Sequence, residues 1–200
     1  MRDMTIRGPR VYLARHGETD WNAAGRWQGH TDVPLNDNGR AQAMALGAQL
    51  RGAGIASVGS SDLSRARETA TIAGGAIGVA ASFVDAGLRE RRFGRFEGLT
   101  RDECVARFPV EWARYLADPR TAPPDGEPQE ALLARATAAV ILAASTLASP
   151  LLLVTHGGTM RALLSSMLGA PVAPIANGAV HVVRVEDGRL VDAAPLDPIR

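Results

Sequence analysis

Apolar residues occur along this chain in two patterns, as short unbroken runs and as longer segments in which they recur at helical spacing. The short runs predict buried strands, at 11–14, 55–60, 80–84 and 151–154. The longer segments predict helices, at 36–52, from 61–63 to about 76, at 128–147 and at 159–168. Asn36 or Asp37 is expected to cap the first helix, and Gly169 to end the last.

The C-terminal residues predict a β-hairpin, with strands at 180–185 and 190–193 joined by the turn 186–189. Strands that alternate with helices indicate a parallel sheet covered on both faces, and the hairpin adds an antiparallel strand at one edge. We therefore expect an α/β protein, a three-layer α/β/α sandwich with a mostly parallel sheet and an antiparallel edge strand. The exposed edge of the hairpin would allow two copies to pair as a homodimer.

Residues 99–128 are less regular than the rest of the chain. They predict two short helices, at 102–108 and 111–116, and five prolines interrupt them, at positions 109, 119, 123, 124 and 128. We interpret this segment as a lid or insertion over the edge of the sheet, after which Pro128 takes the first position of the long helix. The segment is too short to be a domain linker, so residues 1–200 are expected to form one domain.

Composition excludes several classes of protein. Hydrophobic residues make up 46% of the chain and charged residues 22%, values typical of a globular domain. The 22 basic and 21 acidic residues leave a net charge of +1, which argues against partners such as nucleic acid or a membrane surface. Every basic residue is arginine, so an anion site here has to be built from guanidinium groups, which bind phosphate in a bidentate manner.

The single cysteine, Cys104, cannot form an internal disulfide, which is typical of a reducing compartment. No histidine or second cysteine lies near it at the spacing of metal ligands, so we expect it to be a small buried apolar residue. No run approaches the ~20 apolar residues of a membrane span, and residues 1–4 lack the apolar core of a signal peptide. We expect a cytoplasmic protein.

Two histidines stand at the ends of predicted strands, where ligands bind in an open parallel sheet. His16 and His156 are each followed by glycine, whereas His30 and His181 lack this context and are interpreted as loop and hairpin residues. Arg15 places a permanent cation beside His16. Such a cation lowers the pKa of the imidazole and keeps it neutral and nucleophilic near pH 7.

Two further segments carry charged side chains toward the same end of the predicted sheet. Arg65 lies about one turn into the helix that follows the second strand, where the helix N-terminus also attracts anions. Arg67 lies roughly 200° around that helix and is expected in solvent. Glu90 stands among several arginines in 88–98, and we consider it a candidate acid whose protonation depends on whether a phosphate dianion is bound.

Four ordered segments resemble the histidine phosphatase superfamily, and among its members most closely the phosphoglycerate mutase-like branch. They are LARHGET at 13–19, SDLSRA at 61–66, LRERRFG at 88–94 and VTHGG at 154–158. An Arg-His-Gly triplet by itself is a weak signal, whereas four motifs in the right order over about 11–168 are a strong one. Residues 125–128 also resemble a Gly-Glu-Ser stretch of the phosphatases, with Pro128 in place of the serine.

The resemblance implies a role for each matching residue. His16 would be the nucleophile that becomes phosphorylated, Arg15 and Arg65 would bind the transferring phosphoryl group, His156 would hydrogen-bond one of its oxygens, and Glu90 would act as general acid and then base. The resemblance also implies contacts to phosphate or substrate from Asn22, Gln28, Gly29 and Gly157. We expect neither a metal nor another cofactor, because the arginines supply the positive charge.

Three functions fit these residues. A phosphatase transfers the phosphoryl group of a small phosphorylated metabolite to water, a cofactor-dependent phosphoglycerate mutase returns it to another hydroxyl, and a non-catalytic module only binds a phosphorylated ligand. The mutases of this family resemble longer chains whose insertion carries an arginine pair. Here the segment after Gly98 is short, and its arginines stand singly, at positions 101, 107, 114 and 120. An open pocket admits water, so we favour the metal-independent phosphatase.

Overall fold

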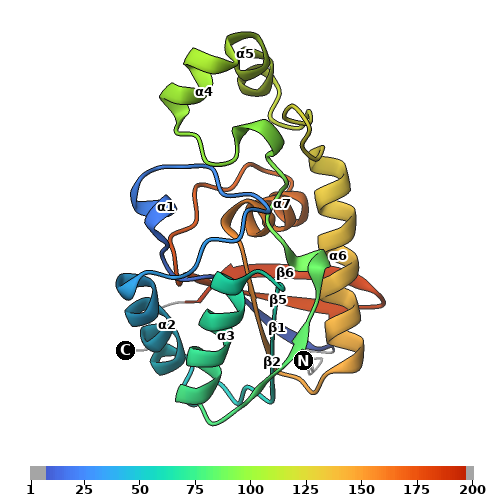
Figure 1. The fold of residues 1–200 in the computed structure, drawn as a ribbon. Helices are drawn as coiled ribbons and strands as arrows, with labels where there is room; N and C mark the ends of the chain where they lie inside the picture. The colour runs from blue at the N-terminus through green and yellow to red at the C-terminus, as the bar shows by residue number, and fades with distance from the viewer. Residues whose placement is uncertain (1–7, 197–200) are drawn as a thin grey trace.

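The computed structural model describes residues 8–196, and its centre is a six-stranded sheet (Figure 1). The strand order is β3-β2-β4-β1-β5-β6. The strands are β1 (Arg10–Arg15), β2 (Ser57–Ser60), β3 (Ala81–Val84), β4 (Leu151–Thr155), β5 (Val180–Glu186) and β6 (Arg189–Pro195). The first four strands of that order are parallel, and β5 pairs antiparallel with both β1 and β6. Residues 1–4, whose composition entered the signal-peptide argument, lie outside the described residues.

Helices cover both faces of the sheet, so the expected three-layer α/β/α sandwich is confirmed. The helices α2 (Asp37–Gln49) and α3 (Ser64–Ala76) pack on one face, and α6 (Gln129–Thr146) and α7 (Gly157–Leu168) pack on the other (Figure 1). The shorter helical segments are α1 (Asp20–Ala23), α4 (Arg101–Arg107), α5 (Pro109–Ala117), η1 (Ala86–Leu88) and η2 (Gly94–Phe96). None of the helices in residues 8–196 is long and apolar enough to cross a membrane.

The two central strands are apolar on both sides because both of their faces are buried. On β1, Leu13 packs toward α6 and α7 while Tyr12 packs toward α2 and α3, and β4 alternates in the same way. The parallel register pairs Arg15 of β1 with Thr155 of β4. The residues that follow these two strands therefore leave the sheet side by side.

Several element boundaries differ from the sequence prediction for identifiable reasons. Pro128 is the N-cap of α6, which begins one residue later than expected. Pro109 starts α5 instead of interrupting the segment, because proline fits the first turn of a helix, where no backbone donor is needed. Helix α7 begins at Gly157, two residues before the expected start, and the short α1 was not predicted.

The segment 99–128 forms a small helical cap over the carboxyl ends of the strands, where Figure 1 shows α4 and α5 at the top. Beneath these helices lies an apolar cluster of Phe93, Phe96, Cys104 and Trp112. Cys104 is fully buried in it, as expected, and burial raises the pKa of its thiol to about 11. The cap is attached to the rest of the chain by Arg91, whose guanidinium donates to the carbonyls of Glu127 and of three cap residues, Pro119, Arg120 and Thr121.

Candidate active site

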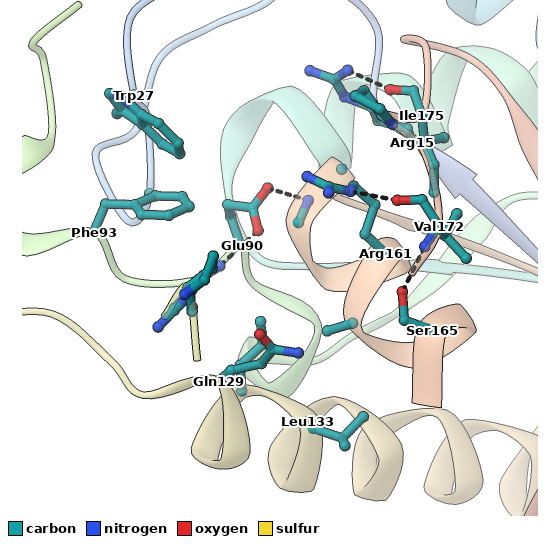
Figure 2. A pocket seen from close by; sticks show the side chains of 18 of the residues that line it. Arg15, Trp27, Glu90, Phe93, Gln129, Leu133, Arg161, Ser165, Val172 and Ile175 are labelled. Atoms are coloured by element: carbon teal, nitrogen blue, oxygen red, sulfur yellow. Dashed lines mark hydrogen bonds between the residues drawn. The ribbon is translucent and has the colours of Figure 1, made fainter. Parts of the chain in front are cut away.

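A cavity of about 1080 Å³ lies at the carboxyl ends of the strands, between α6, α7 and the cap (Figure 2). The site residues expected from the sequence that line it are Arg15, His16, Asn22, Gln28, Gly29, Arg65, Glu90 and Gly157. His156 does not line the cavity. It lies directly behind the wall, fully buried, with its ring centroid 5.0 Å from that of His16.

His16 is held in one tautomer by its own loop. Its Nδ1 lies 2.6 Å from the carbonyl of Gly17, and only a protonated nitrogen can bond a carbonyl oxygen, so Nε2 carries the free lone pair. The pKa of His16 lies well below 6.5, first because the ring is buried and then because Arg65 and Arg15 repel a second positive charge. The imidazole is therefore neutral at pH 7. Gly17 has to be glycine, since a Cβ there would lie 2.3 Å from the carbonyl oxygen of Gly39.

Arg15 and Arg65 are held by backbone carbonyls and not by carboxylates. Arg15 Nη1 donates to Ile175 O at 2.6 Å, and Arg65 donates to the carbonyls of Thr31 and Gly29, each at 2.9 Å. Burial lowers the pKa of Arg65 to about 10, which leaves it charged at neutral pH. The Nε of each arginine is buried and has no hydrogen-bond partner among residues 8–196. Two cationic donors thus stay unused beside His16.

His156 contributes a third unused group. Its Nε2 lies 2.8 Å from Ser61 Oγ, and that oxygen already accepts a hydrogen bond from Leu63 N. When the Ser61 hydroxyl donates to Nε2, the proton of the neutral imidazole resides on Nδ1, which is buried without a partner. Burial, and next the charge of Arg65, hold the pKa of His156 well below 6.5. Within residues 8–196, the buried Nε–H groups of Arg15 and Arg65 lack acceptors, and in this tautomer the Nδ1–H of His156 is a third such donor around His16, as a site for a tetrahedral oxyanion requires.

Glu90 faces the cavity from the opposite side, and both of its oxygens are held by backbone amides (Figure 2). Its Oε1 accepts from Arg91 N at 2.7 Å, and its Oε2 accepts from Gly158 N, in the first turn of α7, at 2.8 Å. A Cβ on residue 158 would lie 2.4 Å from Oε1, so any larger residue there would displace the carboxylate from this position. The early start of α7 thus supplies the amide that orients the candidate acid.

The remaining expected contacts divide into two kinds. Asn22 Oδ1 accepts from Thr19 N and from Asn177 Nδ2, which leaves the Asn22 amide group facing the cavity. Gln28 Oε1 is buried without a partner. Gly29 uses its carbonyl to hold Arg65, so within residues 8–196 its backbone oxygen positions a cation and does not face phosphate.

Several groups at the site were not expected from the sequence. His30, which we interpreted as an ordinary loop residue, places its Nε2 2.9 Å from the carbonyl of Glu90. Asn177 donates to the carbonyl of His16 at 3.0 Å from a loop that is 161 residues away in the chain. Arg161 extends from α7 into the cavity, with its Nε on Val172 O (Figure 2). These contacts join distant segments, so no local sequence pattern signals them.

Aromatic side chains form one wall of the cavity. Trp27 and Phe93 line it, with ring centroids 4.6 Å apart (Figure 2). Phe96 and Trp112 belong to the same aromatic cluster but do not line the cavity. The labelled side chains of Trp27 and Phe93 lie on the side of Glu90 that is opposite Arg15 (Figure 2). The cavity therefore has a cationic end that suits phosphate and an amphipathic end that suits the rest of a substrate.

Residues 11–192 match the sequence profile of the histidine phosphatase superfamily (branch 1). A Citrobacter koseri protein named probable phosphoglycerate mutase GpmB is 43% identical over 169 residues, which cover 80% of this chain and 75% of that protein. The solved structure of Bacillus stearothermophilus YhfR superposes with a TM-score of 0.84 at 31% identity, covering 96% of this chain and 98% of that one. A mycobacterial glucosyl-3-phosphoglycerate phosphatase, solved with VO3, has a TM-score of 0.81 at 29% identity and covers 94% of this chain and 97% of its own.

Proposed function

This chain belongs to the histidine phosphatase superfamily, and on that premise we propose that it hydrolyses small phosphomonoesters through a phosphohistidine formed at His16. The observation that supports this most directly is that the nucleophilic nitrogen and the buried donors around it are free of protein partners among the described residues. His16 Nε2 carries a lone pair, and the buried donors of Arg15, Arg65 and His156 have no partner within the described residues. A phosphoryl group on His16 would lie beside the arginine donors at the cavity and next to the buried His156 ring, whose centroid is 5.0 Å from that of His16.

In the first step, His16 Nε2 attacks phosphorus while the bond from phosphorus to the ester oxygen breaks. The charge on the equatorial oxygens is stabilised by Arg15, Arg65 and His156, donors whose individual loss typically costs about 10²–10³ in rate. Glu90, in its protonated form, gives its proton to the departing alcohol oxygen. The Nδ1 hydrogen bond to Gly17 O stabilises the positive charge that the ring gains in this step.

In the second step, water attacks the phosphohistidine, and the bond between nitrogen and phosphorus breaks. Glu90, now a carboxylate, takes a proton from that water and returns to its starting state. Inorganic phosphate leaves, and His16 is again neutral because burial and the two arginines disfavour its protonated form. The cycle uses only side chains of this protein and one water molecule.

A phosphoglycerate mutase is the second candidate, because the Citrobacter koseri relative carries that name. A mutase has to retain a bisphosphate intermediate, which calls for free cations above the site. Among the described residues, the two cap-side arginines at the cavity are already engaged. Arg91 donates only to backbone carbonyls and to the ring face of Tyr115, and Arg120 pairs with Asp118 at 2.9 Å. Arg161, on α7, keeps free guanidinium donors at the cavity, but among the described residues the cap adds none beside it, which favours transfer to water.

One assay separates the candidates. The protein is incubated with p-nitrophenyl phosphate and, separately, with 3-phosphoglycerate plus 2,3-bisphosphoglycerate. Release of phosphate supports the phosphatase, isomerisation without release supports the mutase, and binding without either reaction supports a phospholigand-binding module.

His16→Ala is the decisive variant, and we expect it to lose phosphatase activity entirely. His181→Ala serves as the control, since His181 lies on β5 away from the cavity, and it should keep its activity. Rapid quenching with labelled substrate should trap label that is stable in base and labile in acid, as a phosphohistidine is. Full activity in His16→Ala, or label on serine, would refute the proposal.

A further inference from the structure

Arg135, on the helix α6, directs both terminal nitrogens of its guanidinium at the segment that ends in Glu90. Nη1 donates to the carbonyls of Gly87 and Arg89, each at 2.8 Å, and Nη2 donates to the carbonyl of Glu90, also at 2.8 Å. Nη2 and Nε bond the two oxygens of Glu127 at 2.8 and 2.7 Å. All five N–H groups of this arginine are thus used, and it does not line the cavity.

Glu127 fixes the direction of that guanidinium. The pair is bidentate and mostly buried, with side-chain exposures of 23% for Arg135 and 15% for Glu127. Glu127 is itself held by its backbone, whose carbonyl accepts from Arg91 and whose amide donates to Arg92 O. Burial raises the pKa of the Glu127 carboxyl, but the hydrogen bond and the charge of Arg135 outweigh it, so that this pKa is lowered on balance. The Glu127 carboxylate stays ionised and binds one edge of the guanidinium, so that the other edge faces the carbonyls of 87–90.

Glu90 is consequently held at both of its ends. Its carboxylate is held by the amides of Arg91 and Gly158, and its backbone carbonyl accepts from Arg135 and also from His30. Residues 89–93 lie between η1 and η2 without helix or strand of their own, and Thr159 of α7 also donates to the carbonyl of Arg89. A loop without ladder hydrogen bonds depends on side chains for its position.

We propose that Arg135, oriented by Glu127, is a positioning residue for proton transfer by Glu90. The inference rests on the proposed function, in which Glu90 protonates the leaving alcohol. Arg135 touches no substrate. It fixes the backbone from which the carboxyl extends, and a misplacement of a catalytic group by about 1 Å typically costs about 10²-fold in rate. Lysine cannot replace it fully, because one ammonium lacks the fork that spans three carbonyls and a carboxylate.

The test measures kcat/KM for p-nitrophenyl, phenyl and n-propyl phosphate, whose leaving groups need a proton to an increasing degree. Glu90→Gln should lose little with p-nitrophenyl phosphate and about 10²–10⁴-fold with n-propyl phosphate. Arg135→Gln should show the same dependence on the leaving group with a smaller loss, about 10–100-fold with n-propyl phosphate. The double variant should be no worse than Glu90→Gln, since both changes remove one function.

Arg40→Gln is the matched control. Arg40 also joins two elements through a carboxylate, Glu68 at 2.7 Å, but it lies between α2 and α3 and contacts nothing in 87–90. We expect Arg40→Gln to change kcat/KM by the same factor for all three substrates, or to leave it unchanged. With n-propyl phosphate, Arg135→Lys should lose less kcat/KM than Arg135→Gln. Glu127→Gln should show the same dependence on the leaving group as Arg135→Gln, with a smaller loss.

The outcomes separate this inference from the function on which it rests. If Glu90→Gln loses activity equally with all three esters, the assignment of Glu90 as the acid fails. If Glu90→Gln behaves as expected but Arg135→Gln loses equally with all three, or loses nothing, only the positioning role is overturned. Should Arg135→Gln not fold, Arg135→Lys and Glu127→Gln decide in its place by the same criterion.

Discussion

At the scale of the residue, the site is defined by close approaches between backbone and side chains. The helix α7 reaches the cavity with two glycines, one beside Arg15 and one beside Glu90. At Gly157 a Cβ would lie 3.1 Å from Arg15 Nε, and at Gly158 it would lie 2.4 Å from Glu90 Oε1. The absence of a side chain at Gly157 and at Gly158 therefore leaves room for Arg15 and for Glu90 at the N-terminus of α7.

Gly158→Ala is expected to displace the Glu90 carboxylate and weaken its hydrogen bond from residue 158 N. Because the misplaced group is the proposed acid, we expect kcat/KM for an alkyl phosphate to fall by about 10²-fold, with little loss of stability. Gly75→Ala is the control, since a Cβ at this helical position meets nothing within 4 Å. Equal activity of the two variants on n-propyl phosphate would contradict this account of Gly158.

At the scale of the element, the cap depends on one buried arginine. Arg91 follows Glu90 directly, so the residue that holds the cap and the proposed acid are neighbours in the chain. Its guanidinium is satisfied by carbonyls from 119–127 and by the ring of Tyr115, whose face lies 5.6 Å away. The aromatic cluster around Trp27 packs the cap from the other side. The cap is thus attached by a polar and an apolar contact that both border the cavity.

Arg91→Gln should loosen the segment 118–127. Each lost hydrogen bond contributes about 1 kcal/mol, so we expect backbone amides of this segment to exchange with deuterium about 10–100-fold faster. Arg92→Gln is the matched control, because its side chain is exposed and makes no hydrogen bond among the described residues. Unchanged exchange in Arg91→Gln would show that the apolar cluster alone holds the cap.

At the scale of the whole molecule, two neutral histidines are buried beside two arginines. Folding keeps His16 and His156 uncharged, with pKa values well below 6.5, whereas in the unfolded chain both protonate near that value. Between the two pKa values the unfolded chain binds more protons, so stability is complete above pH 6.5 and falls as the pH drops below it. The site therefore makes folding depend on pH.

Urea unfolding between pH 7.5 and 5 should reveal this dependence. In that window each histidine lowers the free energy of unfolding by up to about 1.4 kcal/mol per pH unit of acidification. The double variant His16→Asn, His156→Asn should lose less stability than the wild type over the same range. Parallel pH profiles for the two proteins would contradict the assignment of buried neutral imidazoles.

The outer edge of the sheet bears on assembly. Strand β6 pairs with β5 through a register shift at Val183 and Arg184, and Asp192 opposite that shift adopts a φ of 51°. Bulges of this kind keep an edge from adding further strands. This bulge disfavours pairing of two copies along β6. A homodimer through the terminal hairpin stays a prediction.

Much of the fold follows from local patterns. Short apolar runs predicted the positions of four strands, the hairpin pattern predicted β5 and β6, and helical spacing predicted the four helices that cover the sheet. These patterns are informative because they reflect which faces of each element are buried. The turn 186–189 was also correct, with Asp187 and Gly188 at positive φ. The cap was less predictable, since Pro109 begins a helix there and proline is compatible with both a helix start and a break.

By itself the sequence determined the family and the chemical identity of the site, because Arg15-His16-Gly17 and His156-Gly157 follow strands whose ends meet in any parallel sheet. Only the tertiary structure decided which donors remain free. Arg15, Arg65, Arg91 and Arg135 are the same residue type in the sequence. In the structure, Arg15 and Arg65 each keep a buried N–H without a protein partner among the described residues, whereas Arg91 and Arg135 are engaged by carbonyls, an aromatic ring and a carboxylate. Those partners come from segments far apart in the chain, and packing alone brings them within hydrogen-bond distance.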